Sequence, residues 1–191
     1  MHHTIFDTPI IRTLFAWLSS ICLKLSGWKL EGTFPDLPKY VMIAAPHTSN
    51  WDFPITLAIF FAARAKVYWM GKASLFKGPA GPIMRWLGGV PVDRSKSNNM
   101  VQQMVEVFNT NDYMVLTIPP EGTRSRVKQW KTGFYHIAVG AGVPIALAYL
   151  DFSRKRGGFG PVFYPTGNTE QDIADIQSFY KDIIGKNPQQ Q

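Results

Sequence analysis

Blocks of apolar and polar residues follow one another along this chain and predict strands and helices in turn. Short apolar runs typical of buried strands occur at 40–45, 66–70, 113–118 and 143–150. Apolar residues at helical spacing predict helices at 10–28, 54–63, 79–87, 99–108, 132–141 and 169–184. Minor strands are predicted at 28–31, 90–92 and 159–164, and the prolines at 91 and 161 place the last two at sheet edges.

This alternation predicts an α/β fold with a mostly parallel central sheet, helices on both faces and a late hairpin. Several charged or titratable residues follow the ends of predicted strands: His47, Lys72, Arg94, Glu121 and Arg124. Since ligands of open α/β sheets bind at the carboxyl ends of the strands, we expect these side chains to gather at one edge.

The helix at 10–28 is amphipathic and precedes the first core strand. Its apolar stripe comprises Ile10, Ile11, Leu14, Phe15, Leu18, Ile21, Cys22 and Leu25. We therefore divide the chain into an N-terminal amphipathic segment, 1–28, and a domain, 29–191. A helix of this kind lies either in a membrane interface or on the core of its own domain, and its pattern does not separate the two. Its apolar part is short for a membrane crossing, which needs about 20 residues.

The composition and net charge of the chain indicate which classes of partner it can bind. The chain has 191 residues, enough for one domain, and a net charge of +7, which favours anionic partners such as phosphorylated substrates, anionic membranes or an acidic carrier protein. Basic residues occur in small clusters, so we expect no binding of nucleic acid.

The single cysteine, Cys22, excludes an intrachain disulfide, and we expect its side chain to be packed. The four histidines lack the spacing of metal ligands, so we expect no metal and no cofactor.

His47 and Asp52 are the candidate catalytic pair. A strand ends just before His47 and a helix begins near Asp52, so the intervening loop can bring carboxylate and imidazole together. A neutral imidazole accepts a proton from an alcohol near neutral pH, and a carboxylate on its other nitrogen fixes the tautomer. A surface histidine beside a helix-capping aspartate gives the same spacing, and the pair alone does not decide between them.

A basic loop follows the strand at 113–118. Arg124, Arg126, Lys128 and Lys131 lie within eight residues of one another. A guanidinium on a rigid loop matches a phosphate bidentately, although a solvated basic loop has the same composition.

Four sequence blocks in one order resemble the glycerolipid acyltransferase family, which includes the 1-acylglycerol-3-phosphate acyltransferases. The first is the His-x4-Asp block at 47–52, and the second is Gly-Val-Pro-Val-Asp-Arg at 89–94. The third is Pro-Glu-Gly-Thr-Arg-Ser at 120–125, and the fourth is the Val-Pro-Ile strand at 143–145. Together they cover most of residues 40–150, and the first combined with the third is the specific feature.

The resemblance implies roles for individual residues. His47 is the expected general base on the acceptor hydroxyl, and Asp52 orients it. The expected substrate-binding residues are Lys72, Arg94, Glu121, Gly122, Thr123 and Arg124, with the cations on the phosphate of the acceptor. We also expect backbone N–H groups near 48–50 to stabilise the oxyanion, and a hydrophobic tunnel beneath His47 lined by residues such as Trp51, Phe60 or Met70.

The implied activity is transfer of a fatty acyl group from a thioester, acyl-CoA or acyl carrier protein, to the hydroxyl of a lysophospholipid, foremost 1-acylglycerol 3-phosphate. Two alternatives stay open: the same chemistry on another acceptor such as a lyso-aminolipid, and a non-catalytic module that binds lipid or acyl carrier. The expected location is the cytoplasmic face of a membrane, with peripheral or monotopic attachment at the membrane surface.

Overall fold

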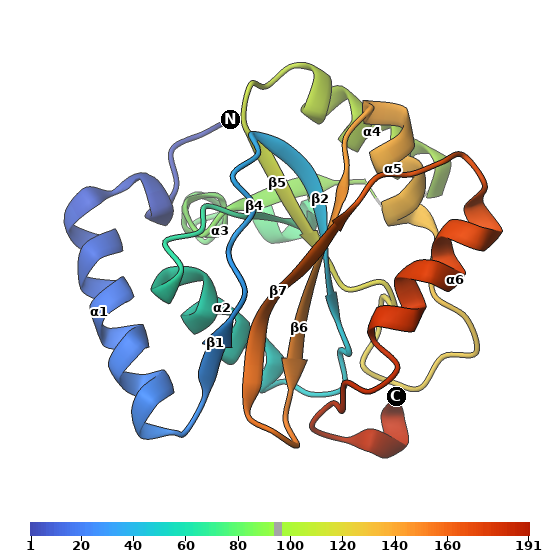
Figure 1. Cartoon of the computed structure of the whole chain (residues 1–191). Coiled ribbons are helices and arrows are strands. Elements are labelled where there is room, and N and C mark those ends of the chain that lie inside the picture. Colours follow the sequence, from blue (N-terminus) through green and yellow to red (C-terminus); the bar gives the residue numbers. More distant parts are fainter. Residues whose placement is uncertain (94–96) are drawn as a thin grey trace.

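One sheet organises the molecule. Within residues 1–93 and 97–191, which the computed structural model describes, it has seven strands (Figure 1). Their spatial order is β1 (Lys29–Glu31), β7 (Arg156–Phe163), β6 (Ile145–Asp151), β2 (Lys39–Ala45), β5 (Met114–Ile118), β3 (Tyr68–Lys72) and β4 (Gly89–Val92). Strands β6, β2, β5, β3 and β4 run parallel, while β7 is antiparallel to β6. The predicted α/β fold and late hairpin are confirmed.

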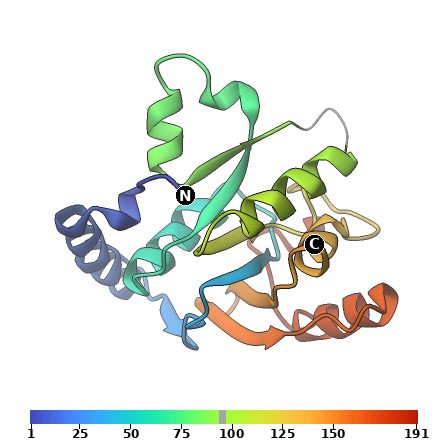
Figure 2. The same cartoon turned by 90° about the horizontal axis from the view of Figure 1, so that it is seen from above.

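Helices cover both faces of this sheet (Figure 2). The first face carries α1 (Pro9–Leu25), α2 (Asp52–Ala62) and α3 (Gly81–Trp86), and the second carries α4 (Ser97–Asn109), α5 (Gly133–Ala141) and α6 (Thr169–Phe179). Three short 3-10 helices complete the description: η1 (Ile5–Asp7), η2 (Ala73–Phe76) and η3 (Pro188–Gln190).

Two predicted details are wrong. The terminal helix ends at Phe179 rather than at 184. Strand β7, which we predicted at 159–164 as an edge strand, is not at the edge of the sheet. Strand β1 pairs with it from Lys29↔Arg156 to Glu31↔Gly158. Pro161 lies beyond this pairing, so its missing N–H costs no hydrogen bond to β1. The other predicted edge strand, β4 with Pro91, is indeed at the edge.

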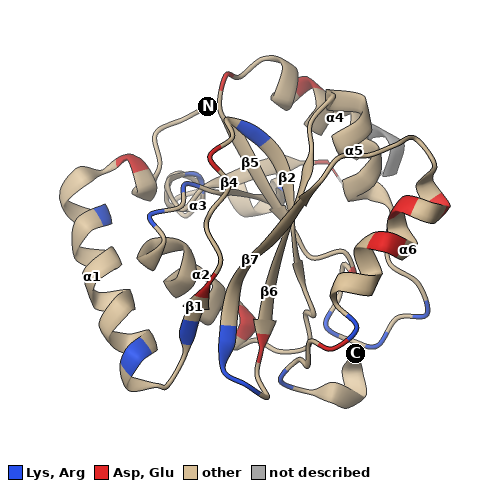
Figure 3. Ribbon diagram, viewed as in Figure 1, with Lys and Arg blue, Asp and Glu red and all other residues tan. Residues whose placement is uncertain are grey.

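The parallel strands bring their carboxyl ends to one edge of the sheet, the lower edge in Figure 1, where the C-terminus also lies. Loops that leave this edge begin at Pro46 after β2, at Ala73 after β3 and at Pro119 after β5. Figure 3 shows several Lys and Arg positions on loops around the C-terminus. Parallel pairing thus collects segments from distant parts of the sequence.

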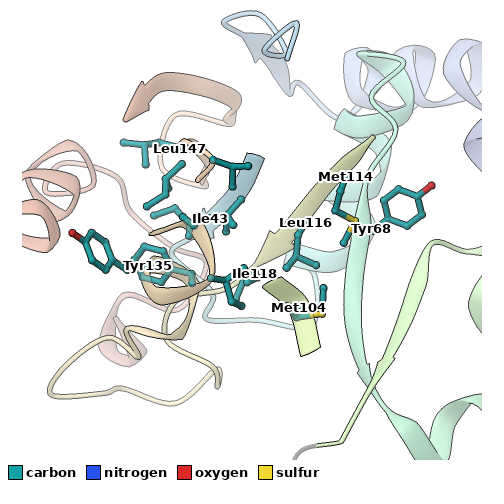
Figure 4. Packing of buried hydrophobic residues seen from close by; sticks show 14 of the residues in the cluster. Ile43, Tyr68, Met104, Met114, Leu116, Ile118, Tyr135 and Leu147 are labelled. Carbon is teal, nitrogen blue, oxygen red and sulfur yellow. The ribbon is translucent and has the colours of Figure 1, made fainter. Parts of the chain in front are cut away.

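Successive side chains of β2 point to opposite faces of the sheet and so belong to two separate parts of the core. Val41 and Ile43 face α4, α5 and α6, while Tyr40 and Met42 face α1 and α2, and all four are fully buried. Figure 4 shows the first of these clusters, whose members include Met104 of α4 and Leu116 and Ile118 of β5. Met104 is completely buried and fills the core, and Met100 of the same helix is partly buried against this cluster.

Helix α1 packs on α2 through its less apolar side. Its buried residues are Ala16, Ser19 and Leu23. Most of the predicted apolar stripe instead faces outward: Ile10 is 82% exposed, Leu14 49% and Leu25 83%. Its inner border contacts the domain, where Ile11 packs against the core and the Phe15 ring lies 5.0 Å from that of Phe61. Cys22, which we expected to be packed, is exposed for the same reason. Of the helices in the described ranges, none has the length and apolarity that crossing a membrane requires.

Candidate functional site

The loop between β2 and α2 folds back so that His47 meets Asp52. Strand β2 ends at Ala45 and α2 begins at Asp52 itself. The His47 Nδ1 atom lies 3.0 Å from Asp52 Oδ2. A neutral imidazole bound in this way donates through Nδ1–H and keeps Nε2 free to accept a proton. The predicted pairing of these two side chains is therefore present.

Asp52 is held by the same loop that it orients. Its Oδ2 also accepts the backbone N–H groups of Thr48 and Ser49, each at 2.8 Å. The residue is only 4% exposed, and these donors compensate for much of the cost of burying a carboxylate. Because both N–H groups are engaged, Thr48 and Ser49 do not supply the oxyanion donors that we expected from this loop.

Glu121 lies behind His47. Its Oε1 accepts the backbone N–H of His47 at 3.1 Å, and the side chain is 9% exposed. Burial raises the pKa of the Glu121 carboxyl above 4.5, against the lowering effect of hydrogen bonds from its own backbone N–H and that of His47. The carboxylate thus ties the loop after β5 to the loop after β2. Its expected contact with substrate stays a prediction.

Arg124 joins the same two loops at the surface. Its Nη1 donates to the side-chain oxygen of Asn50, which lies between His47 and Asp52 in the sequence. The guanidinium therefore lies on the same side of the molecule as the candidate pair. Gly122 has φ +65°, a conformation that glycine adopts without strain, and the Lys131 side chain crosses it closely enough that a Cβ would lie 2.9 Å from Lys131 Cδ.

The remaining predicted site residues make no described contact with His47 or Asp52. Thr123 is exposed, and its hydroxyl accepts the backbone N–H of Ser125. Lys72 is exposed at the carboxyl end of β3, which neighbours β5 in the sheet. Arg94 lies outside the described residues, two positions after the end of β4. The structure thus unites His47, Asp52, Glu121 and Arg124 and leaves the substrate contacts of the others as predictions.

An apolar cavity of about 480 Å³ opens beside this pair. His47 and Asp52 line it together with apolar side chains of η1, α2, α3 and four strands, among them Phe6, Phe53, Leu57, Phe60, Met84 and Phe159. Of the predicted lining residues, Phe60 is present. Trp51 and Met70 do not line it; Trp51 is 59% exposed, with Lys186 Nζ 4.7 Å above its ring.

Sequence reasoning missed two contacts of the site. Asn50, the partner of Arg124, lies inside the first block, but its chemical type gave no reason to single it out. Asn187 hydrogen-bonds Thr48 across 139 positions of sequence, and no local pattern predicts such a pair. In the described part of the chain, no group of three or more His, Cys, Asp or Glu side chains is arranged to hold a metal ion.

The chain combines a mostly parallel sheet, a His–Asp pair at the carboxyl ends of its strands and an adjoining apolar cavity, an arrangement that suits an α/β enzyme acting on an apolar substrate. The sequence model of the family described as Acyltransferase matches residues 32–149, which is more than half of the chain. The protein therefore belongs to this family.

Named relatives agree with this assignment. The chain is 27% identical over 184 residues to the 1-acyl-sn-glycerol-3-phosphate acyltransferase of Haemophilus influenzae, covering 85% of this chain and 75% of that protein. It is 33% identical over 131 residues to the enzyme of the same name from Escherichia coli, covering 63% of this chain and 52% of that one. The crystal structure of the 1-acyl-sn-glycerophosphate acyltransferase PlsC from Thermotoga maritima superposes with a TM-score of 0.63 at 18% identity, covering 90% of this chain and 77% of that one, which shows a shared fold.

The buried Glu121 predicts a pH-dependent contribution to stability. Since the native state raises the pKa of this carboxyl above 4.5, the group stabilises the fold below its ordinary pKa, and this contribution is lost as pH rises through the raised value. Glu121→Gln keeps an acceptor for the His47 N–H but does not titrate. We expect the unfolding free energy of the variant minus that of wild type to grow from about pH 4 to pH 8, by about 1.4 kcal/mol for each pH unit between the two pKa values.

Urea denaturation at several pH values measures this difference. Glu106→Gln, a substitution of an exposed glutamate on α4, controls for the loss of one carboxylate. A difference between Glu121→Gln and wild type that is constant across the pH range would contradict a burial effect at this site.

Proposed function

We propose that this protein is an O-acyltransferase that moves a fatty acyl group from a thioester donor to the free hydroxyl of a lysophospholipid, foremost 1-acylglycerol 3-phosphate. The observation that supports this proposal most directly is the 3.0 Å contact between His47 Nδ1 and Asp52 Oδ2 beside an apolar cavity of about 480 Å³. The names of the relatives support the choice of acceptor. The donor is acyl-CoA or an acyl carrier protein, and the positive net charge of +7 suits either acidic partner.

The proposed mechanism is direct transfer. His47 Nε2 accepts the proton of the acceptor hydroxyl while Asp52 stabilises the imidazolium that forms. The hydroxyl oxygen attacks the thioester carbonyl, the C–S bond breaks, and the imidazolium returns its proton to the departing thiolate. No acyl-enzyme is needed, and the single cysteine, Cys22, is exposed on α1 rather than beside His47.

The cavity and the basic loop accept opposite ends of such a substrate. The cavity shelters an acyl chain, and each methylene removed from water contributes about 0.8 kcal/mol to binding. Arg124 uses one of its five N–H donors on Asn50 and has others for a phosphate. We assign Lys72 and Arg94 to the same phosphate, and Glu121, Gly122 and Thr123 to the shape of the acceptor site.

We propose that the protein works at the cytoplasmic face of a membrane, attached peripherally or monotopically through the segment 1–28. The outward apolar face of α1 supports this placement, because an amphipathic helix buries such a face at the membrane interface. Other exposed apolar side chains lie on helices that line the cavity: Phe53 of α2 and Ile83 of α3. A lipid substrate enters such a cavity without crossing water.

Replacing His47 with Ala tests the chemistry. We expect kcat/KM for acyl transfer to fall by roughly 100-fold or more, because general-base catalysis contributes about that much. The measurement is loss of acyl thioester in the presence of lysophospholipid, with circular dichroism to check the fold. His136→Ala, at an exposed position on α5, is the matched control and should keep wild-type activity. A His47→Ala variant that keeps most of its activity would exclude the mechanism. If the wild-type protein binds lipid but consumes no thioester, a non-catalytic module would be favoured instead.

Replacing Arg124 with Ala tests the acceptor. A charge-assisted hydrogen bond to phosphate is worth about 1.5–3 kcal/mol, so KM for 1-acylglycerol 3-phosphate should rise about tenfold or more. KM for an unphosphorylated lyso-lipid should stay unchanged. Arg126→Ala, two positions along the same exposed loop, provides the control. Because Arg124 also holds Asn50 in the loop of the candidate pair, a fall in kcat common to both acceptors does not bear on the phosphate. An equal rise in KM for both acceptors would argue for another acceptor, such as a lyso-aminolipid.

Polar substitutions on α1 test the membrane placement. Deletion of the whole segment is unsuitable because Phe6 and Leu23 belong to the core. Combined Ile10→Gln, Trp17→Gln and Leu25→Gln changes only exposed positions and should reduce binding to anionic phospholipid vesicles at least tenfold, since each buried apolar side chain contributes about 1.5–3 kcal/mol. The control is Val139→Gln with Tyr164→Gln, two exposed apolar positions elsewhere. Unchanged vesicle co-sedimentation of the triple variant would rule out this role for α1.

A further inference from the structure

The segment 185–191 packs against the loop that carries the candidate pair. It begins from a fixed position, because Ile183 is 5% exposed and the Phe152 N–H donates to the Ile184 carbonyl at 2.9 Å. Gly185 passes so close to Thr48 that a Cβ there would lie 2.6 Å from Thr48 Oγ1. The segment lies outside residues 32–149, the part that matches the family. Its contacts therefore join a segment beyond the matched region to a loop within it.

Asn187 makes two hydrogen bonds to one residue of the loop. Its Nδ2 donates to the Thr48 carbonyl at 2.8 Å, and its backbone N–H donates to Thr48 Oγ1 at 3.2 Å. The Gln190 side chain, with its amide turned to donate, reaches the same carbonyl at 2.7 Å. Thr48 is 2% exposed, so these bonds replace water that it would otherwise need.

Thr48 connects Asn187 to the catalytic pair. Its N–H donates to Asp52 Oδ2, the oxygen that also receives His47 Nδ1. The peptide group before Thr48 is thus held by Asp52, and the one after it is held on its N–H side by Asp52 and on its carbonyl side by Asn187. Rotation of Thr48 would move its N–H away from Asp52 and change the direction of the carboxylate toward the imidazole. A small misplacement of a catalytic group is enough to slow a reaction substantially.

We propose that Asn187 is a positioning residue for the His47–Asp52 pair, acting through Thr48. This inference rests on the proposed function for its effect on rate, but its effect on geometry is independent of any activity. Asn187 touches neither His47 nor Asp52 and takes no part in proton transfer. It acts by holding the loop in the conformation in which Asp52 accepts all three N–H groups.

The test compares Asn187→Leu, similar in size but without an amide, with Gln189→Leu in the same segment. Gln189 is exposed and makes no hydrogen bond within the described residues. For Asn187→Leu we expect kcat to fall about tenfold with KM within about twofold, since displacement of a catalytic group acts on the chemical step. Gln189→Leu should match wild type. The added Gln190→Leu change should lower kcat further by freeing the Thr48 carbonyl.

A second measurement reads the geometry without substrate. The His47 Nδ1–H proton, hydrogen-bonded to Asp52, gives a downfield NMR resonance that His47→Ala assigns by its loss. We expect this resonance to weaken or disappear in Asn187→Leu and to persist in Gln189→Leu. An Asn187→Leu protein with wild-type kcat and an unchanged resonance would overturn the inference.

The two proposals fail in different ways. If His47→Ala keeps its activity while Asn187→Leu loses the resonance, the proposed chemistry is wrong and the positioning role stands. If His47→Ala is inactive and the resonance survives in Asn187→Leu, the positioning role is wrong and the chemistry stands. Should Asn187→Leu fail to fold, Thr48→Val removes the Oγ1 acceptor alone, and an unchanged resonance together with unchanged kcat there would count against the inference.

Discussion

The Asp52 carboxylate is the point on which the site depends. One oxygen, Oδ2, accepts hydrogen bonds from the imidazole of His47 and from the backbone N–H groups of Thr48 and Ser49. A buried carboxylate is stable only with such donors, and its place in the first turn of α2 adds the favourable field of the helix dipole. The loop has to curl around this oxygen to satisfy it, and that curl presents His47 to the cavity.

Two further segments hold the curled loop from other sides. Glu121 binds the His47 N–H from beneath, and Arg124 binds Asn50 at the surface. Both come from the loop after β5, the strand that pairs in parallel with β2. Parallel pairing therefore does more than build the core, because it fixes the distance between two loops that are more than 70 residues apart in sequence. The segment 185–191 reaches the loop from the remaining side.

The predictable part of this structure is the part with a local cause. The run of apolar residues in β5 and the strand-to-helix change at 46–54 predicted the sheet and the meeting of His47 with Asp52, because both depend on neighbouring residues. The orientation of α1 was not predictable, since it depends on α2, against which α1 buries Ala16, Ser19 and Leu23 while most of the apolar stripe stays exposed. The burial of Glu121 and the contact of Asn187 with Thr48 were missed because each depends on residues 74 or 139 positions away. Trp51 shows the same limit: its apolar character suggested a cavity wall, whereas the course of the loop turns it outward beside Lys186.

The two faces of the sheet differ in a way that suits the proposed reaction. Behind β2, fully buried residues such as Ile43 and Leu116 pack against three helices, which gives the pair a rigid support. In front, Phe60 and Phe159 border open apolar space, which lacks the dispersion contacts of a filled core and so lowers stability. An acyl chain that enters this space restores those contacts, and binding to the native state then stabilises it. His47 Nδ1 is committed to Asp52, so the imidazole offers only Nε2 to a substrate. In the proposed reaction, donor and acceptor therefore meet at that nitrogen, with the acyl chain in the cavity and the headgroup on the side of Arg124.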